Sequence, residues 1–312
     1  MKLNIYGDFC PTGSNVEFFK AGEYAKVFGR VCALNHTADY NIVNLECALG
    51  SKREAVEKSG PSLAAPIECI SGLVKAGFQV VSVANNHSLD NGMVSFEEEL
   101  SALEHAGLTY VGANTKDGTK NCIFVGEGAA RTAILSIGDH EFNTDEYGYG
   151  VSIFSDHRTY SHIYELKQQV QHVIVIYHSG YENASYPSPQ LMKRCRTMVE
   201  CGASAVLCQH SHCIGAYEEY QGSVIVYGQG NFLFDLTDRE SWHRGLCVSM
   251  NIDENGIKYE FVPLAVKNGC IVELSEGECE SVIGQFMSRS REISDPCFVS
   301  QRWKEFLQSE AW

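Results

Sequence analysis

Short apolar runs in this chain stop repeatedly on residues that bind metal ions or transfer protons. Five such runs end on the following side chains: Asp8, Glu46, Asn86 with His87, His178, and His210 with His212. In layered α/β folds, the carboxyl ends of the strands line the crevice in which ligands bind. We therefore expect residues that are distant in the sequence to converge at one edge of a sheet.

The apolar runs alternate with segments of helical periodicity, which predicts an α/β fold. The expected strands are 3–6, 41–45, 79–83, 109–111, 122–125, 132–137, 173–177, 205–208, 224–227, 246–251 and 258–265, the last two as an antiparallel pair. The expected helices are 66–76, 93–106, 161–171, 190–201 and, in the tail, 278–291 and 299–308. The polar stretch 51–62 is expected to be a surface loop.

Charge and composition exclude several classes of protein. The 24 Lys and Arg residues against 39 Asp and Glu residues give a net charge of −15, so a broad nucleic-acid-binding surface is not expected. No apolar run approaches the roughly 18 residues of a transmembrane segment, and the N-terminus holds no signal core. For the chain as given we expect a cytoplasmic location, and an extracytoplasmic one only if a signal or anchor precedes it. The composition does not indicate an oligomeric state.

The ligand types at the strand ends predict a metal centre. Carboxylates, an amide oxygen and imidazoles together suit zinc, manganese or iron rather than calcium. Six candidate ligands exceed the needs of one tetrahedral ion, so two divalent ions that share a bridging carboxylate are expected. Taken singly, each residue has a simpler explanation, for example a helix cap for Asp8, a solvated charge for Glu46 or a core histidine for His178. The joint pattern favours the metal centre.

The same residues lie in motifs that resemble those of a known family. The motifs are Gly7-Asp8, Asn44-Leu45-Glu46, the run 84–92 (ANNHSLDNG), 178–182 (HSGYE), His210-Ser211-His212 and 227–234 (YGQGNFLF). Their order, from about residue 3 to about residue 235, resembles CapA-type proteins of capsule and poly-γ-glutamate synthesis, which are similar to calcineurin-like metallophosphoesterases. The resemblance implies a four-layer αββα sandwich of two mixed β-sheets flanked by helices. We expect this domain to span residues 1–270, with a C-terminal helical extension, 271–312, packed on it.

The resemblance also implies roles for individual residues. One ion would be held by Asp8, Glu46 and His212, and a second by Glu46, Asn86, His178 and His210, with His87 as the catalytic histidine. Two departures from the wider superfamily concern the first ion: Cys10 stands where a histidine is usual, and Glu46 replaces a shorter aspartate. A smaller departure is Gln209, which precedes His210 where glycine is common.

Further polar residues are candidates for contacting the substrate. His140 and Glu141 follow the expected strand 132–137, Glu182 lies four residues after His178, and Asn231 lies in the last motif. For His140 and Glu141 a polar turn is an equal alternative, and Glu182 is equally explained as a surface carboxylate. The segment 181–189 (YENASYPSP) is expected to form a stiff rim loop over the site.

These observations favour a metal-dependent hydrolase that acts on a phosphoester or related anionic small molecule or polymer, with a link to capsule or exopolymer synthesis. The alternative is a non-catalytic capsule-assembly or polymer-binding protein whose metal site is structural. A metal-free scaffold with a decayed site is disfavoured, because the candidate ligands are intact.

Overall fold

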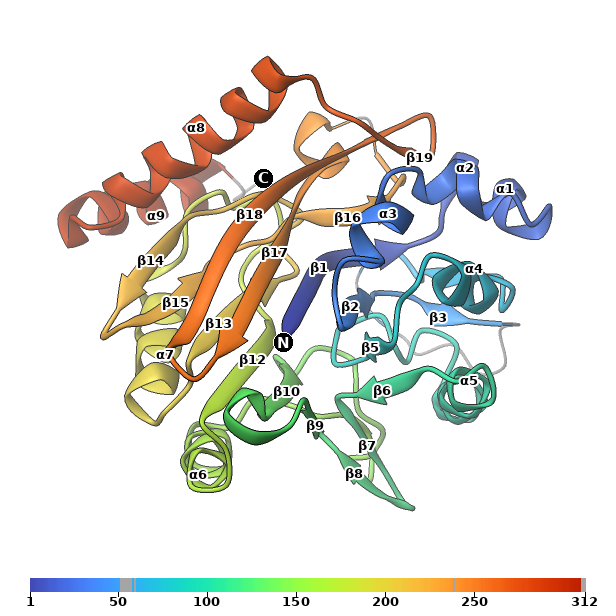
Figure 1. The fold of residues 1–312 in the computed structure, drawn as a ribbon, viewed down its shortest axis with the longest axis horizontal. Coiled ribbons are helices and arrows are strands. Elements are labelled where there is room, and N and C mark those ends of the chain that lie inside the picture. The colour runs from blue at the N-terminus through green and yellow to red at the C-terminus, as the bar shows by residue number, and fades with distance from the viewer. Residues whose placement is uncertain (51–57, 59, 238, 310–312) are drawn as a thin grey trace.

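Two mixed β-sheets form the centre of the protein (Figure 1). The computed structural model describes residues 1–50, 58, 60–237 and 239–309, so most of the expected loop 51–62 lies outside the described residues. Across the first sheet the strands are β19 (Cys270–Val272), β18 (Gly256–Lys267), β17 (Arg244–Asp253), β1 (Lys2–Cys10), β2 (Tyr40–Leu45), β5 (Val80–Ser82) and β6 (Thr109–Val111), and β16 (Asn231–Phe234) pairs with the end of β1. Pairing is parallel from β1 to β6 and antiparallel from β1 to β19.

The second sheet is also mixed. Its strands are, in order, β14 (Tyr217–Tyr220), β15 (Ser223–Val226), β13 (Ala205–Gln209), β12 (His172–His178), β10 (Thr132–Gly138) and β9 (Cys122–Val125). The four central strands run parallel, and β14 and β9 pair with their neighbours in antiparallel fashion. Smaller sheets join β11 (Gly150–Val151), β7 (Ala113–Thr115) and β8 (Gly118–Lys120), and β3 (Ala48–Leu49) with β4 (Ala64–Ala65).

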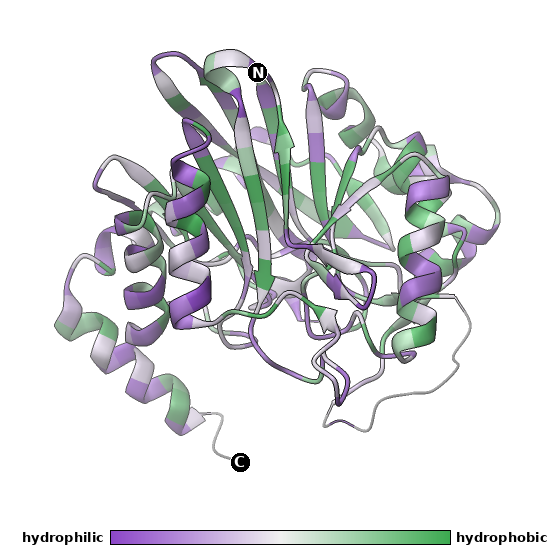
Figure 2. Cartoon of the chain, turned by 90° about the horizontal axis from the view of Figure 1, so that it is seen from below, coloured by the Kyte–Doolittle hydropathy of each residue, from purple (hydrophilic) through white to green (hydrophobic). Residues whose placement is uncertain are grey.

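Helices cover the outer face of each sheet. The first sheet carries α1 (Val16–Lys20), α2 (Tyr24–Phe28), α3 (Val31–Asn35), α4 (Cys69–Lys75) and α5 (Met93–His105). The second carries α6 (Asp156–Lys167) and α7 (Pro189–Glu200), and α9 (Pro296–Ser309) packs on α7. Helix α8 (Glu276–Glu292) contacts β14 and β18, one strand of each sheet. Short 3₁₀ turns lie at Gly13–Asn15, Gly128–Ala130 and Glu240–His243. Figure 2 shows the apolar sides of the helices turned toward the sheets.

The alternation of side chains along the strands explains the layers. In β10, Ile134 joins the apolar cluster between the two sheets, whereas Leu135 joins the cluster under α6 and α7. In β1, Ile5 packs between the sheets and its neighbour Tyr6 packs under the helices of the first sheet. Successive residues of a strand point to opposite faces, so strands that are apolar on both faces are buried on both. The resulting four-layer αββα arrangement is the fold expected from the sequence.

Local signals account for two of the helix starts. Ser188 accepts a hydrogen bond from the backbone N–H of Leu191, and Pro189 occupies the first turn of α7. Ser275 and Glu278 form a reciprocal capping box at the start of α8. The predicted helix 161–171 is shifted relative to α6, which begins at Asp156 and ends at Lys167.

The tail forms two helices on the second sheet's side of the fold. Phe286 of α8 is fully buried between the sheets' outer strands, and Val299 of α9 joins the cluster under α7. The boundary predicted at residues 270 and 271 falls inside β19, which pairs with β18. Residues 310–312 of the predicted extension lie outside the described part of the chain.

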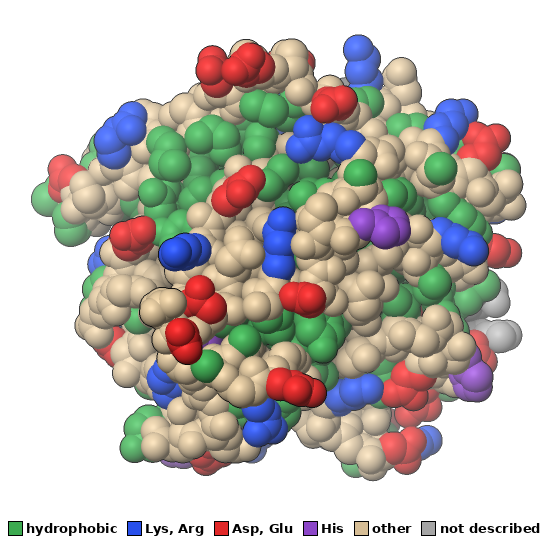
Figure 3. Space-filling view, in the orientation of Figure 1, with side chains coloured by type: hydrophobic (Ala, Val, Ile, Leu, Met, Phe, Trp, Pro, Cys, Tyr) green, Lys and Arg blue, Asp and Glu red, His purple; other side chains and the backbone are tan. Residues whose placement is uncertain are grey.

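Two surface observations bear on partners. No helix among the described residues has the length and apolar character needed to cross a membrane. On the face drawn in Figure 3, Lys and Arg side chains are scattered among acidic ones rather than gathered in one patch. The prediction that nucleic acid is not a partner remains a prediction.

Candidate metal centre

The predicted ligands lie where parallel strands of the two sheets end, at the same edge of both sheets. Asp8 lies near the end of β1, at a register shift between Asp8 and Phe9, and Glu46 follows β2 directly. His178 is the last residue of β12, and His210 comes directly after β13. Because the carboxyl ends of parallel strands meet at the same edge, all four side chains face the crevice between the sheets.

The first group of ligand atoms comprises Asp8, Glu46 and His212. The ligand atoms that the three residues offer lie within 4.8 Å of one another, and all three side chains are buried. His212 Nδ1 is 3.8 Å from Asp8 Oδ2, and His212 Nε2 is 3.8 Å from Glu46 Oε1. Because Nδ1 also lies 2.8 Å from Asn231 Oδ1, Nε2 is the His212 atom left for an ion.

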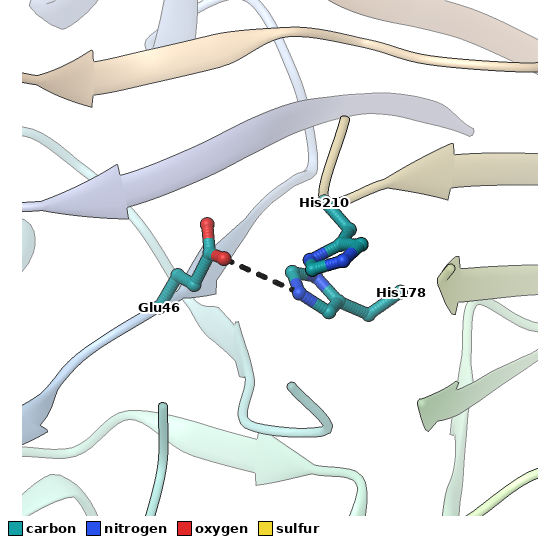
Figure 4. Close-up of side chains that lie close together, drawn as sticks. All are labelled: Glu46, His178 and His210. Atoms are coloured by element: carbon teal, nitrogen blue, oxygen red, sulfur yellow. Dashed lines mark ion pairs between the residues drawn. The ribbon is translucent and has the colours of Figure 1, made fainter. Parts of the chain in front are cut away.

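The second group comprises Glu46, His178 and His210, again with ligand atoms within 4.8 Å (Figure 4). His178 Nε2 lies 3.3 Å from Glu46 Oε1 and 2.9 Å from Asn86 Oδ1. Glu46 therefore belongs to both groups, in the position of a bridging ligand. The two groups contain the carboxylates and histidines of the implied ligand sets, and Asn86 lies beside the second group. That these residues bind ions remains a prediction.

Unsatisfied buried atoms test whether these residues suit a cation. Glu46 is fully buried, and neither of its carboxylate oxygens has a hydrogen-bond partner within the described part of the chain. Burial raises the pKa of Glu46 well above its usual value, and burial together with the nearby Glu46 raises the pKa of Asp8 to about 8. Two buried carboxylates this close are costly unless positive charge compensates them. The residues present therefore fit divalent cations.

The imidazoles are held in the neutral form that binds metals. Burial lowers the pKa of His178, and it lowers the pKa of His212 to about 3. Burial and the neighbouring imidazoles lower the pKa of His210 well below its usual value, and its Nδ1 atom has no hydrogen-bond partner among described residues. A neutral imidazole offers a lone pair to a cation.

Backbone strain marks the His210–His212 turn. His210 has a φ of +88° and His212 a φ of +52°, a left-handed conformation that residues with a side chain adopt at a cost. The backbone N–H of His210 donates to Asp8 Oδ2 over 3.0 Å. This bond ties the turn after β13 to the aspartate of β1, so the strain places both imidazoles opposite the carboxylates.

Three polar residues of the site were not assigned roles from the sequence. Asn44 Nδ2 donates to Asp8 Oδ1 over 2.8 Å and lies 3.2 Å from His178 Nδ1, so it orients two candidate ligands. Asp90 and Lys58 contact His87. The signal for Asn44 and Asp90 was their place inside the motifs, whereas nothing in the sequence pattern around Lys58 pointed to the site.

His87 sits in a buried hydrogen-bonded cluster. Its Nδ1 atom lies 2.7 Å from Asp90 Oδ2 and 2.9 Å from Lys58 Nζ, and Lys58 also pairs with Asp90. Burial, and to a smaller extent the charge of Lys58, lowers the pKa of His87. The hydrogen bond that Asp90 accepts from Nδ1 acts in the opposite direction and raises this pKa. Asp90 thus fixes the ring orientation of the histidine that was predicted to be catalytic.

Asn231 lies behind the first ligand group. Its Oδ1 atom is 2.8 Å from His212 Nδ1, and its Nδ2 donates to the backbone oxygen of Trp242 over 3.0 Å. The Trp242 ring packs on the His212 ring with centroids 3.9 Å apart. Asn231 is 1% exposed, so this geometry favours orientation of His212, while its predicted contact with substrate remains a prediction.

Cys10 is not part of either ligand group found among the described residues. Its side chain is buried in the apolar cluster beneath the first sheet's helices, and Cys47 is its hydrogen-bonding neighbour. Burial raises the pKa of the Cys10 thiol, which disfavours the thiolate that would bind a cation. The structure therefore offers no replacement at Cys10 for the histidine expected there.

The other predicted substrate residues line a cavity of about 800 Å³ beside His210. His140, Glu141 and Glu182 all contribute to its wall, and Glu141 Oε2 lies 3.7 Å from His210 Nε2. Arg194 of α7 also lines the cavity and pairs with Asp139 over 3.3 Å.

The two-sheet fold is that of the calcineurin-like metallophosphoesterases. A putative 5′-nucleotidase from Staphylococcus aureus superposes with a TM-score of 0.51 at 13% identity, covering 92% of this chain and 58% of that one. A phosphatase from Mycoplasma pneumoniae superposes with a TM-score of 0.52 at 12% identity, covering 85% and 93%. At such low identity these likenesses concern the fold alone.

Sequence comparison identifies the family. The profile described as "Bacterial capsule synthesis protein PGA_cap" matches residues 2–236, and the chain belongs to this family. The capsule biosynthesis protein CapA of Bacillus anthracis is 30% identical over 220 residues, which are 66% of this chain and 52% of that protein. The PGA biosynthesis protein CapA of Bacillus subtilis is 27% identical over 208 residues, 64% and 54% of the two chains. The chain thus spans about half the length of these relatives.

Proposed function

We propose that this protein is a metal-dependent hydrolase that acts on a phosphoester or a related anionic group. The observation that carries the proposal is Glu46, a fully buried carboxylate with unsatisfied oxygens that is shared by two ligand groups. Such an arrangement suits two divalent ions, of manganese, zinc or iron, with Asn86 Oδ1 as an additional ligand of the second. Bound divalent cations supply charge that stabilises a phosphoryl transition state and acidify water at neutral pH.

The chain's own groups would orient the reactants and move a proton. His87, oriented through Nδ1 by Asp90, would have to be in its imidazolium form to donate a proton from Nε2 to the leaving-group oxygen, and the negative charge of a bound phosphoryl group would favour that form. Asn44, through Asp8 and His178, and Asn231, through His212, would hold the ligand side chains in place. The burial of these groups excludes water from the ligands and strengthens their electrostatic interactions.

Relatives named for capsule and PGA biosynthesis support a role in making a capsule or exopolymer such as poly-γ-glutamate. The reaction would then act on a precursor or on the polymer, and the acidic residues that line the cavity beside His210 favour the precursor. The names of the relatives support a role in this pathway, whereas the geometry of the site concerns only the group that reacts.

Elemental analysis and turnover together test the hydrolase proposal. We expect the purified full chain, supplied with manganese, to retain close to two ions per chain and to hydrolyse p-nitrophenyl phosphate or its diester. A protein that retains the ions but turns over no phosphomonoester, phosphodiester or poly-γ-glutamate would contradict it. A matched Glu46→Gln preparation controls for contaminating phosphatases, because it should lose both metal and turnover.

A non-catalytic polymer-binding protein with a structural metal site is the second candidate. Cys10 favours it, since the buried thiol leaves the first group with three ligands, Asp8, Glu46 and His212. Retention of tightly bound metal without turnover, together with binding of an anionic polymer, would select this candidate.

A further inference from the structure

The cavity beside the metal centre opens on the second ligand group. His210 belongs both to that group and to the cavity wall, so a molecule bound through the second ion position extends into this space. The cavity holds about 800 Å³, more than a phosphoryl group needs. The part of the substrate that does not react must therefore lie here.

Helix α9 supplies an apolar wall of the cavity. Phe306 and Leu307 line it from α9, while Phe154, Tyr181 and Leu191 line it from other elements. Only about half of the Leu307 surface is covered, since 46% remains exposed. An apolar group of a ligand would gain favourable contact by covering this surface.

Aromatic contacts fasten α9 to the rim loop at the mouth of the cavity. The Trp303 ring meets Tyr181 with centroids 4.7 Å apart, and the Phe298 ring meets Tyr186 with centroids 5.5 Å apart. The Arg302 guanidinium lies 5.1 Å from the centroid of the Tyr186 ring. The wall is therefore held by several independent contacts.

The charged groups of the cavity are acidic. Asp139, Glu141 and Glu182 line it, and Arg194 is the one Lys or Arg side chain among the described lining residues. Arg194 already pairs with Asp139 over 3.3 Å. A second phosphate or carboxylate on a ligand would meet carboxylates without a free cation to bind it.

We propose that this cavity, walled by α9, binds an uncharged and partly aromatic group of a phosphoester and disfavours a second anionic group. The proposal rests on the hydrolase function and names the substrate class of that same site. Helix α9 lies outside residues 2–236, so the family match does not account for this wall of the cavity.

Binding of three phosphonates to the full chain in saturating manganese tests the proposal by calorimetry. The probes are methylphosphonate, phenylphosphonate and 2-carboxyethylphosphonate, which share the metal-binding group and differ in what enters the cavity. We expect phenylphosphonate to bind about threefold to tenfold more tightly than methylphosphonate, and 2-carboxyethylphosphonate to bind no better than methylphosphonate.

Substitutions on α9 locate the effect. Phe306→Ala and, separately, Leu307→Ala should each weaken phenylphosphonate binding severalfold and leave methylphosphonate binding unchanged. Lys304→Ala, an exposed position of the same helix that is not among the lining residues, is the matched control and should change neither. Leu307 is half exposed, so its truncation keeps the test valid even if Phe306→Ala loosens the helix.

The outcomes separate this inference from the hydrolase proposal. Equal binding of phenyl and methyl probes, stronger binding of the carboxylate probe, or no phosphonate binding by the metal-loaded protein would overturn the cavity assignment. The expected order of affinities in a protein without turnover would support the cavity assignment and contradict only the hydrolase function.

Discussion

Glu46 destabilises the metal-free fold and is at the same time a candidate metal ligand. The carboxylate is fully buried without a hydrogen-bond partner in the described part of the chain, and its pKa is raised well above the usual value by burial. In the metal-free protein, an ionised Glu46 destabilises the fold, because a buried charge lacks compensation. The same lack of partners is what makes it available to a cation.

We predict that Glu46→Gln raises the melting temperature of the metal-free protein at neutral pH. The amide removes the ionisable group while keeping the side chain's shape. Metal content should fall at the same time, with affinity weakened by at least about tenfold. Thermal scans in EDTA and elemental analysis measure the two effects, and Glu17→Gln on exposed α1 is the control. A variant that is less stable without metal would contradict this account of Glu46.

His87 is predicted to act on the substrate rather than on the metal. His87→Ala should lower kcat by about 10²- to 10⁴-fold and leave metal content near that of the unmodified chain. Asp90→Asn should lower kcat less, because the ring stays in place while its orientation loosens. Turnover and elemental analysis of the same preparations provide the measurement. Loss of metal in His87→Ala would instead make His87 a ligand or a structural residue.

Helix α5 carries a further buried carboxylate that belongs to neither ligand group. Glu99 is 1% exposed, and its Oε2 accepts the backbone N–H of Leu49 in β3 over 2.7 Å. Burial raises the pKa of Glu99 to about 8. A folded-state pKa above the unfolded value of about 4.5 means that this group stabilises the fold fully below about pH 4.5. That stabilisation is lost as the pH rises through about 8.

Glu99→Gln should therefore increase stability in a pH-dependent way. Near pH 5 we expect the variant and the unmodified protein to have similar stability. Near pH 8.5 we expect a higher melting temperature for the variant, which corresponds to a gain in the free energy of unfolding on the order of 1 kcal/mol or more. The comparison uses metal-free protein, so that ligand titration contributes equally to both. Glu97→Gln, a partly exposed position on the same helix, should show no such trend. If the melting temperatures of the two proteins differed equally at both pH values, Glu99 would not have the raised pKa that its burial indicates.

The strands and helices also show which elements local signals can predict. The expected strand 109–111 coincides with β6, and 122–125 coincides with β9. Short elements such as α1 to α3 and β16 were not predicted, since they carry too few residues for a periodic pattern. β16 forms because it pairs with the end of β1, with Asn231 opposite Asp8.

Metal binding should couple the two sheets. Asp8 and Glu46 come from the first sheet and His178 and His210 from the second, so an ion among them links both halves of the sandwich. A ligand that binds only the folded state adds about 2.7 kcal/mol at a concentration of 100 times its Kd. We therefore expect manganese to raise the melting temperature and EDTA to reverse the rise.

The size of that stabilisation should increase with pH. The pKa of Asp8 is raised to about 8 in the metal-free protein, so a bound proton stabilises the fold at lower pH and is lost as the pH rises through about 8. An ion competes with that proton, which makes binding weaker in acid. The manganese-induced shift should be larger near pH 8.5 than near pH 6, by differential scanning calorimetry. Asp8→Asn should reduce the pH dependence, while proton competition at Glu46, whose pKa is also raised, should preserve part of it. A shift that shrinks with rising pH would contradict the assignment of Asp8.

Patterns along the chain sufficed for the alternation of strands and helices, the acidic character and the six candidate ligands at strand ends. These depend on local periodicity and on residue type, which a single sequence carries. The pairing of the ligands into groups that share Glu46, the contact of Lys58 with His87, and the wall that α9 builds beside His210 appeared only in three dimensions. They depend on contacts between residues tens to hundreds of positions apart, and those contacts are set by the packing of two sheets and their helices rather than by any local pattern.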